Sequence, residues 1–487
     1  VRHDAGSHDL VVIGAGVAGL NALYAAVRYL PKGARVLLID QKPVAGGMWT
    51  IAYDYVRLHQ PHPMFTVGNL AWNWTKPPDY LATRDEVQRH LASALDRIAD
   101  RVRLETRFGH TVSACDEIET GLGRQARVSF HPNDDPARVT TVTASRAIHA
   151  QGVNYRPSTP LALSSRAVIP IIPQDLRTTL AAHPKAPLYV IGGGKSGMDT
   201  ILAAIEADPS RRVVLVSGPG TSFINRDRNF PIGVKRWVAG LPLSRMGRDL
   251  GTRFDGDNEE AVLARFRRHY SSDPEGPDRV FLFGIQSSEE RARISAGLSR
   301  HHRDYLIDVT DEAQGPVMAL RGGAREAVEP GSIFVTCTGS IVRGGAADAW
   351  QPCLSPGDAV LRIDARDSYH LLTSVSGFFM VHLLYRGLLR GTGHYTLDHE
   401  ALFARNRNAW AAATITQLYM HRVLSVQLLP LKLLNRCALD FDRWYPVPRR
   451  LLSLVQLKSS AVRDLARCRA ALDRVADRFG IPCGPLE

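Results

Sequence analysis

The sequence predicts an α/β protein with two Rossmann-like domains and a helical C-terminal extension. Three observations lead to this fold class. A glycine-rich turn follows the apolar run 10–13, and a second such turn, 178 positions later, follows the apolar run 188–191. Beyond about residue 400 the apolar residues have mostly helical spacing. Each apolar run reads as a buried strand that turns directly into a helix.

Both turns have the G-x-G-x-x-G spacing of a dinucleotide-binding fingerprint. The first glycine makes the tight bend, the second lets the backbone approach a pyrophosphate, and the third lets the helix pack closely on the sheet. The helix N-terminus faces the negative charge. The first fingerprint supplies Gly14, Gly16 and Gly19, and the second supplies Gly192, Gly194, Lys195, Ser196 and Gly197. Two such sites predict a flavoprotein that a nicotinamide cofactor reduces.

The residue that ends the second strand of each unit indicates which dinucleotide is bound. Asp40 ends the first of these strands, 21 residues after Gly19, and a carboxylate there accepts hydrogen bonds from the ribose diol of FAD or NAD. The alternative is that Asp40 is an ordinary turn residue with no ligand. In the second unit Ser217 takes this place, so no acid repels a 2′-phosphate. With the nearby cations Lys195, Arg226 and Arg228, this favours NADPH over NADH.

The order of strands and turns predicts four segments. Residues 84–99 have helical spacing, and strands are expected near 102–104, 127–130 and 138–148. The apolar strand 332–336 ends in a small-residue turn that suggests a return to the first domain. We expect an FAD-binding domain, first part, at 1–165 and an NADP-binding domain at 166–325, with a polar insertion at 243–303. The FAD-binding return segment follows at 326–400, and a basic helical extension at 401–487.

Composition and charge narrow the class of protein. The 487 residues carry a net charge of +12, and residues 401–487 hold 14 Lys and Arg against 6 Asp and Glu. We expect this region to form a helical cap on the dinucleotide domains, with a last helix at about 459–479. Weak contact with a membrane, through the apolar stretch 423–434, or with an acidic partner is the alternative. No nucleic-acid motif, signal peptide or transmembrane segment is expected, so the prediction is cytoplasmic.

The six cysteines are scattered and form no C-x-x-C pair, which argues against a dithiol reductase and against a zinc site. No other residues have the spacing of metal ligands, so no metal is predicted. The pair His301-His302 and the single His382 are interpreted as structural residues.

These motifs together resemble the class B flavoprotein monooxygenases, the group of flavin-containing monooxygenases and Baeyer–Villiger enzymes. The resemblance covers about residues 9–390. Gly46-Gly47-Met48-Trp49 is similar to the family's G-G-x-W element, and Thr336-Cys337-Thr338-Gly339 is similar to its A-T-G segment. The resemblance implies that NADPH reduces FAD and that the reduced flavin forms a peroxide with O2. That peroxide transfers one oxygen atom to a small organic metabolite, by Baeyer–Villiger or heteroatom oxygenation. Gly47, Trp49 and Gly339 then belong to the cofactor sites.

The resemblance also suggests catalytic candidates. His59 occupies the place of the family's flavin-side asparagine, and it is expected to control the fate of the peroxide with a transition near its reference pKa of about 6.5. The alternative is a packing histidine. Arg57 is the second candidate, as a cation that stabilises an anion.

Two other functions stay open from the sequence. One is an NAD(P)H:acceptor reductase or oxidase that inserts no oxygen. The other is a sensor or scaffold that holds its dinucleotides structurally. The substrate and the oligomeric state are not indicated by any motif.

Overall fold

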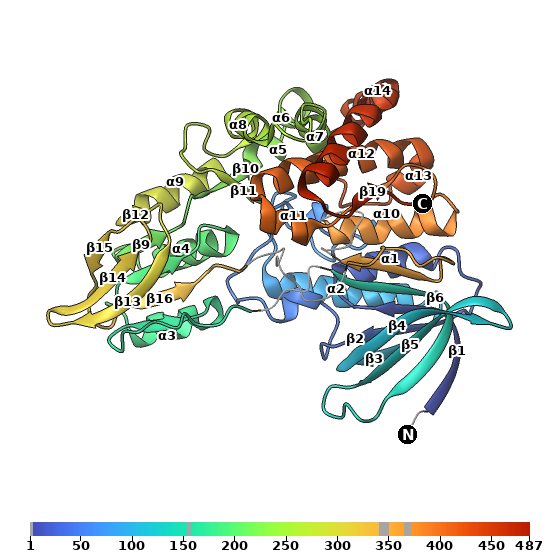
Figure 1. The fold of residues 1–487 in the computed structure, drawn as a ribbon, viewed down its shortest axis with the longest axis horizontal. Coiled ribbons are helices and arrows are strands. Elements are labelled where there is room, and N and C mark those ends of the chain that lie inside the picture. Colours follow the sequence, from blue (N-terminus) through green and yellow to red (C-terminus); the bar gives the residue numbers. More distant parts are fainter. Residues whose placement is uncertain (1–2, 153–156, 340–349, 365–371) are drawn as a thin grey trace.

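The computed structural model describes residues 3–152, 157–339, 350–364 and 372–487. Its helices and strands gather into two domains with open sheets and one helical cap (Figure 1). The mixed α/β class with largely parallel sheets is the predicted one.

The first domain contains a seven-stranded sheet in the order β3-β2-β1-β6-β5-β4, with β17 paired to β6. The strands β1, β2, β3, β6 and β17 run parallel, with α1 and α2 connecting the first three, while β4 and β5 form an antiparallel hairpin. Its elements are β1 (His3–Ile13), α1 (Val17–Ala26), β2 (Arg35–Asp40), α2 (Arg84–Ala99), β3 (Arg103–Phe108), β4 (His110–Thr120), β5 (Gly123–Pro132), β6 (Thr140–Gly152), β17 (Val360–Asp364) and α10 (Thr373–Tyr385).

The predicted helix at 84–99 is confirmed as α2, and its start has a chemical cause. Thr83 and Glu86 form a reciprocal capping box, in which each side chain accepts a hydrogen bond from the other's backbone N–H. The buried side chains Val87, Leu91 and Leu95 then recur on the face that packs on the sheet.

The second domain contains a five-stranded parallel sheet in the order β12-β9-β8-β16-β7 and a small antiparallel sheet of β13, β14 and β15. Its elements are β7 (Ile169–Ile171), α3 (Leu176–Ala182), β8 (Leu188–Ile191), α4 (Lys195–Ala207), β9 (Val213–Val216), α9 (Ser288–Gly297), β12 (Arg300–His302), β13 (Leu306–Glu312), β14 (Gly315–Leu320), β15 (Arg325–Ala327) and β16 (Ile333–Thr336).

The strand at 332–336 lies in a different sheet from the one expected. As β16 it pairs with β8 and β7 in the centre of the second sheet, whereas β17 is the strand that rejoins the first sheet. The return to the first domain therefore comes after residue 336, not at 326. A fully apolar strand suits the middle of either parallel sheet, so its composition did not distinguish them.

The helical cap combines the middle of the chain with its end. Helices α7 and α8 pack on α12, and their apolar side chains join one core with those of α14 and the first domain. Figure 1 shows this layer above both sheets. Its elements are β10 (Thr221–Asn225), α5 (Arg226–Asn229), α6 (Lys235–Val238), α7 (Leu243–Gly251), α8 (Glu259–Tyr270), β11 (Val280–Gln286), β18 (Tyr395–Leu397), α11 (His399–Arg405), α12 (Arg407–Leu428), α13 (Leu431–Leu434), α14 (Val447–Phe479) and β19 (Cys483–Pro485).

The last helix is longer than expected. Helix α14 ends as predicted, at Gly480 in the left-handed conformation (φ 54°), but it begins at Val447 rather than near 459. Leu465, Leu472 and Val475 face the core, whereas Val462, an apolar residue of the same helix, is 85% exposed. The first turns were missed because their apolar residues do not follow the buried stripe.

Candidate functional site

The two glycine fingerprints fold into the same local geometry. A Cβ on Gly14 would lie 2.4 Å from the carbonyl oxygen of Ala150, and one on Gly192 would lie 2.5 Å from that of Cys337. A Cβ on Gly19 would lie 1.8 Å from the oxygen of Gly14. At Gly197 the equivalent distance to the oxygen of Gly192 is 2.1 Å. In both units the first and third glycines are therefore required by backbone contacts.

The middle glycines face the places where pyrophosphates are expected. A Cβ on Gly194 would meet no atom within 4 Å, so the backbone there is open to a ligand. Gly16 faces Gly47, whose Cα would lie 3.3 Å from a Cβ on Gly16. Gly16 and Gly194 are also the N-cap residues of α1 and α4, and no side chain caps either helix. Their first-turn N–H groups are thus free to bind an anion.

Asp40 closes the first fingerprint from the tip of β2. Its Oδ2 accepts a hydrogen bond from Ala15 N (2.5 Å) and its Oδ1 accepts one from Lys42 N (2.7 Å). Burial raises the pKa of this carboxyl group. The carboxylate therefore braces the turn as well as standing where the ribose was predicted.

The Gly46–Trp49 element lies against this turn. Gly46 N donates to the carbonyl oxygen of Ala15, which brings the short helix Gly47–Thr50 onto the fingerprint. Trp49 is buried, with its ring edge-on to Phe65 at 5.6 Å between centroids. This position suits the predicted role of shaping a pocket rather than reacting.

Ser217, at the tip of β9, contacts His301, which the sequence predicted to be a structural residue only. Its Oγ lies 2.7 Å from Nε2 of His301 on the neighbouring strand β12. Burial, followed by the charges of Arg303 and Arg291, lowers the pKa of His301 to about 4. The cations that influence this strand tip are therefore Arg303 and Arg291.

The three cations predicted to bind the 2′-phosphate have other partners. Lys195 pairs with Asp199 one turn along α4, and Arg226 pairs with Glu290 at 2.7 Å. Arg228 donates to the carbonyl oxygen of His269. Their expected role at a phosphate stays a prediction.

A hydrogen-bonded cluster joins the two domains at the N-terminus of α4. Tyr53 Oη donates to Oδ2 of the buried Asp199 at 2.9 Å, while Lys195 Nζ donates to Oδ1 of the same carboxylate. Tyr55 Oη and Thr200 Oγ1 lie 2.9 Å apart beside them. The cluster fixes Lys195 and the loop after Trp49 in one arrangement.

His59 lies beside this cluster. Arg226 Nη1 donates to the carbonyl oxygen of His59 (3.3 Å), and Arg226 is itself held by Glu290. Among the residues that the structure describes, none forms a hydrogen bond with the imidazole ring. Burial, followed by the charges of Lys195 and Arg226, lowers the pKa of His59 to about 3. The expected transition near pH 6.5 is therefore wrong, because two cations and the surrounding protein oppose protonation.

Arg57 and Gly339 lie apart from these contacts. The exposed guanidinium of Arg57 donates to the carbonyl oxygen of Leu81 and lies 6.0 Å from the centre of the Tyr80 ring. Gly339 is exposed after β16, with Ser158 Oγ 3.6 Å from where a Cβ would stand. Among the residues that the structure describes, no hydrogen bond or ion pair joins Arg57 to His59.

Sequence reasoning missed Tyr53, Glu290 and His301. A signal existed for one of them, since Ser287-Ser288-Glu289-Glu290 has the spacing of a capping box, which the structure contains at the start of α9. Asp199 follows Lys195 by four residues, so an ion pair on one helix face was also readable. Tyr53 and His301 have no local signal, because their partners are 146 and 84 residues away.

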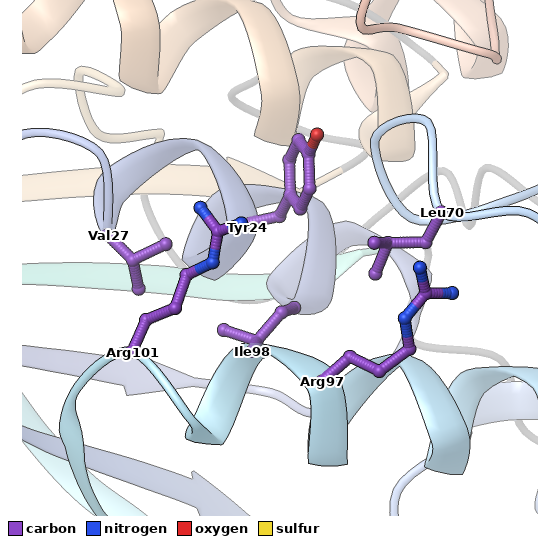
Figure 2. Close-up of a pocket in the computed structure, with 6 residues that line it drawn as sticks. All are labelled: Tyr24, Val27, Leu70, Arg97, Ile98 and Arg101. Carbon is purple, nitrogen blue, oxygen red and sulfur yellow. The ribbon is translucent and has the colours of Figure 1, made fainter.

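Other parts of the described chain carry less chemistry. A small cavity of about 100 Å³ lies between α1, α2 and the loop at Leu70, lined by the side chains of Arg97 on α2 and of Arg101 in the turn after it (Figure 2). Within the described ranges no cluster of residues could hold a metal ion. The helices described include none that is long and apolar enough to cross a membrane.

Comparison with known proteins agrees with the geometry. Residues 8–220, somewhat less than half of the chain, match the profile of the family described as pyridine nucleotide-disulphide oxidoreductase. This stretch contains both fingerprints. The match confirms the prediction of an oxidoreductase with two nucleotide-binding units.

Solved structures establish the fold. The ornithine N-hydroxylase of Kutzneria sp. 744 is similar with a TM-score of 0.51, at 13% identity, over 78% of this chain and 99% of that one. Ornithine hydroxylase from Pseudomonas aeruginosa gives 0.50, at 14% identity, over 78% and 100%. The chain has the fold of flavoprotein monooxygenases, as its sequence resemblance implied. The Kutzneria structure contains reduced FAD and NADP+, the cofactor pair predicted here.

Curated relatives match over a short stretch. Uncharacterized proteins of Mycobacterium bovis and Mycobacterium tuberculosis are 43% identical over 63 residues, which is 13% of this chain. The match spans only 11% of the length of those relatives.

Proposed function

We propose that this protein is a monooxygenase that uses FAD and NADPH to transfer one oxygen atom from O2 to a small organic metabolite. The observation that carries the proposal is the pair of glycine cradles with one geometry, joined by the Tyr53–Asp199–Lys195 cluster. In this reading FAD lies on Gly14, Gly16, Gly19 and Asp40, and NADPH lies on Gly192, Gly194 and Gly197.

The residues present fit both cofactors. Each cradle has a helix N-terminus without a side-chain cap, and the backbone at Gly194 is open to ligand space, while Gly16 faces the backbone of Gly47. An uncapped helix N-terminus beside a glycine turn is what a pyrophosphate requires. When bound, this pair supplies hydride transfer from nicotinamide to flavin and the activation of dioxygen.

The protein's own part is to fix polar groups between the two cradles. Asp199 orients the Lys195 ammonium at the N-terminus of α4, and Tyr53 holds Asp199 from the first domain. His59 stays neutral, so one ring nitrogen donates a hydrogen bond and the other accepts one. A neutral donor that does not change its charge near pH 7 suits the place of the asparagine that it replaces.

The thiols of this chain favour oxygen transfer over disulphide reduction, which the matched family's description would suggest. None of the six cysteines, all of which lie in the described ranges, forms a disulfide. Burial raises the pKa of Cys115, Cys337, Cys437, Cys468 and Cys483 to about 12. Thiols with such pKa values stay protonated at neutral pH, and the thiolate is the reactive form.

The experiment that tests this function is substrate profiling. Purified protein, loaded with FAD, is given NADPH, O2 and panels of amines, sulfides and ketones. Primary amines come first, because the structural neighbours are N-hydroxylases. We expect NADPH consumption to rise with one class and its product to gain the mass of one oxygen atom. NADPH oxidation that yields only hydrogen peroxide or a reduced acceptor would favour the reductase instead.

The role of His59 has its own test. His59→Ala should keep its FAD and its rate of reduction by NADPH, because neither cradle is changed. It should release more hydrogen peroxide per NADPH, while His59→Asn, which restores an uncharged donor, should stay coupled. Arg57→Ala is the matched control on the same loop. Equal coupling in all three variants would remove His59 from the mechanism.

A further inference from the structure

One surface of the helical cap exposes many large apolar side chains. Fifteen large apolar residues are exposed in the described parts of the chain, and nine of them lie on or beside α6, α13 and the first turns of α14. Trp237 is 59% exposed, Val238 80% and Leu452 64%. The nine are Ile232, Val234, Trp237, Val238, Leu431, Val447, Leu451, Leu452 and Val455.

Hydrogen bonds tie these three elements into one surface. Arg449 Nη1, in the first turn of α14, donates to the carbonyl oxygens of Arg236 (3.0 Å) and Ala239 at α6. Arg450 Nη2 donates to Asn435 Oδ1, just after α13. Figure 1 shows α6 and α14 together at the top of the molecule, away from both sheets. We call this the α6–α14 surface.

The same surface is strongly basic. Residues 228–248 and 443–463 together contain ten Lys and Arg and no Asp or Glu. Lys235 and Lys458 are exposed, and neither forms an ion pair with any residue in the described ranges. Arg236 lies 4.7 Å from the centre of the Trp444 ring, so part of the basic charge is stacked on aromatic surface. Arg248 and Arg463 pair with Asp464, which follows the second stretch directly. The exposed apolar residues are thus flanked by cations, and Lys235 and Lys458 have no carboxylate partner within the described ranges.

We propose that the α6–α14 surface binds the surface of a bilayer containing anionic lipids, without crossing it. Exposed Trp, Leu and Val enter the boundary between headgroups and acyl chains, and flanking Lys and Arg attract anionic headgroups. This arrangement agrees with the finding that no described helix could span a membrane.

Two other occupants fit the surface less well. A second copy related by a two-fold axis would bring the same cations face to face, with no carboxylate in either stretch to compensate. A nucleic acid would pair with the cations but leave the exposed Trp237, Leu451 and Leu452 against phosphates and water. An anionic lipid surface satisfies both the charge and the apolar side chains.

The apolar stretch expected to contact a membrane is not part of this surface. Val423, Leu424, Val426, Leu433 and Leu434 are all buried in the cap, and Leu431 is the large apolar residue of 423–434 that is exposed. The residues that carry the proposal lie before the predicted insertion at 243–303 and before the predicted last helix at about 459–479, so neither prediction identified them.

The test is sedimentation of the full FAD-loaded chain with vesicles at about 0.15 M salt, where surface charges act over about 8 Å. Phosphatidylcholine vesicles are compared with vesicles that also contain phosphatidylglycerol. We expect binding to the anionic vesicles and little to the neutral ones. Lys235→Gln with Lys458→Gln should weaken binding by about 25-fold, since each cation near the surface contributes about fivefold.

The apolar contribution is tested with a matched pair of double variants. Leu451→Ser with Leu452→Ser should weaken binding at least about tenfold, because each buried CH2 group contributes about fourfold. Leu122→Ser with Ile307→Ser replaces two exposed apolar residues on the β4–β5 turn and β13, which are 86% and 63% exposed, and should bind as the unchanged protein does. Circular dichroism checks that all variants are folded.

Three outcomes would overturn the proposal. The first is no binding of the unchanged protein to anionic vesicles. The second is equal loss of binding in the two double variants. The third is a dimer, seen by sedimentation velocity, that Leu451→Ser with Leu452→Ser dissociates, since this would assign the surface to a second copy. None of these outcomes depends on oxygenase activity, so the proposal and the proposed function fail separately.

Discussion

Gly194→Ala separates cofactor binding from folding. A Cβ at this position would meet no protein atom within 4 Å, and the backbone φ of −77° is one that alanine adopts readily. Alanine is a poorer N-cap than glycine, but it also loses less conformational entropy on folding. The free energy of unfolding should therefore change by no more than about 1 kcal/mol.

The same methyl group would stand where the pyrophosphate of NADPH must approach the N-terminus of α4. Losing one charge-assisted hydrogen bond to the phosphate costs about 1.5–3 kcal/mol. The Michaelis constant for NADPH should therefore rise about 10- to 150-fold. The FAD content and the melting temperature should stay close to those of the unchanged protein.

The assay is steady-state NADPH oxidation, with flavin absorbance and thermal melting measured on the same preparations. Gly197→Ala is the contrasting variant, since its Cβ would lie 2.1 Å from the carbonyl oxygen of Gly192 and must disturb the backbone. A Gly194→Ala protein with an NADPH constant within twofold of the original would refute the placement of the nucleotide. A loss of stability equal to that of Gly197→Ala would refute the reading of Gly194 as open to ligand.

Three further predictions follow from the site and the buried histidines. Gly16→Val should purify without flavin, since its Cβ would lie 3.3 Å from Gly47 Cα on the side of the predicted FAD, and full flavin content would contradict this. Arg303 pairs with Asp278, and its charge acts on His301 beside Ser217, so we propose it as a further contact of the 2′-phosphate. Arg303→Gln should then raise the Michaelis constant for NADPH but not for NADH, and an unchanged ratio of the two constants would exclude this contact. Burial lowers the pKa of His59 to about 3 and of His90, His149, His382 and His399 to about 4. These residues are neutral when folded and take up protons near pH 6.5 when unfolded, so the unfolded chain binds more protons between about pH 4 and 6.5. As the pH decreases through this range, the free energy of unfolding should fall by up to about 1.4 kcal/mol per pH unit for each of these histidines. Equal melting temperatures at pH 8 and pH 5 would argue against this.

Local sequence signals predicted the parts of the molecule whose causes are local. The fingerprint strands, the helix α2 and the end of α14 follow from apolar spacing, a capping box and a C-terminal glycine. The placement of β16 in the second sheet could not be predicted, because a strand of apolar residues fits the centre of either sheet. The packing of α7 and α8 on α12 also joins segments more than 130 residues apart.

The residues of the candidate site also fall into those that local sequence predicts and those that depend on distant parts of the chain. Asp40 and the glycines could be found because a fixed spacing places them at one strand edge. The neutral state of His59 could not, because it depends on burial and on the charges of Lys195 and Arg226, which come from the second domain and the helical cap. Ser217 was identified by its position, but its partner His301 became visible only when β12 was placed beside β9.

The central claim is that the two cradles hold FAD and NADPH for oxygen transfer. The most direct measurement is rapid mixing of the NADPH-reduced protein with O2, followed by its absorbance spectrum. The account predicts one FAD per chain, reduction by NADPH without oxygen, and then a transient spectrum distinct from both oxidised and reduced flavin before the oxidised form returns. Direct return to oxidised flavin, with no transient at any substrate or oxygen concentration, would contradict it.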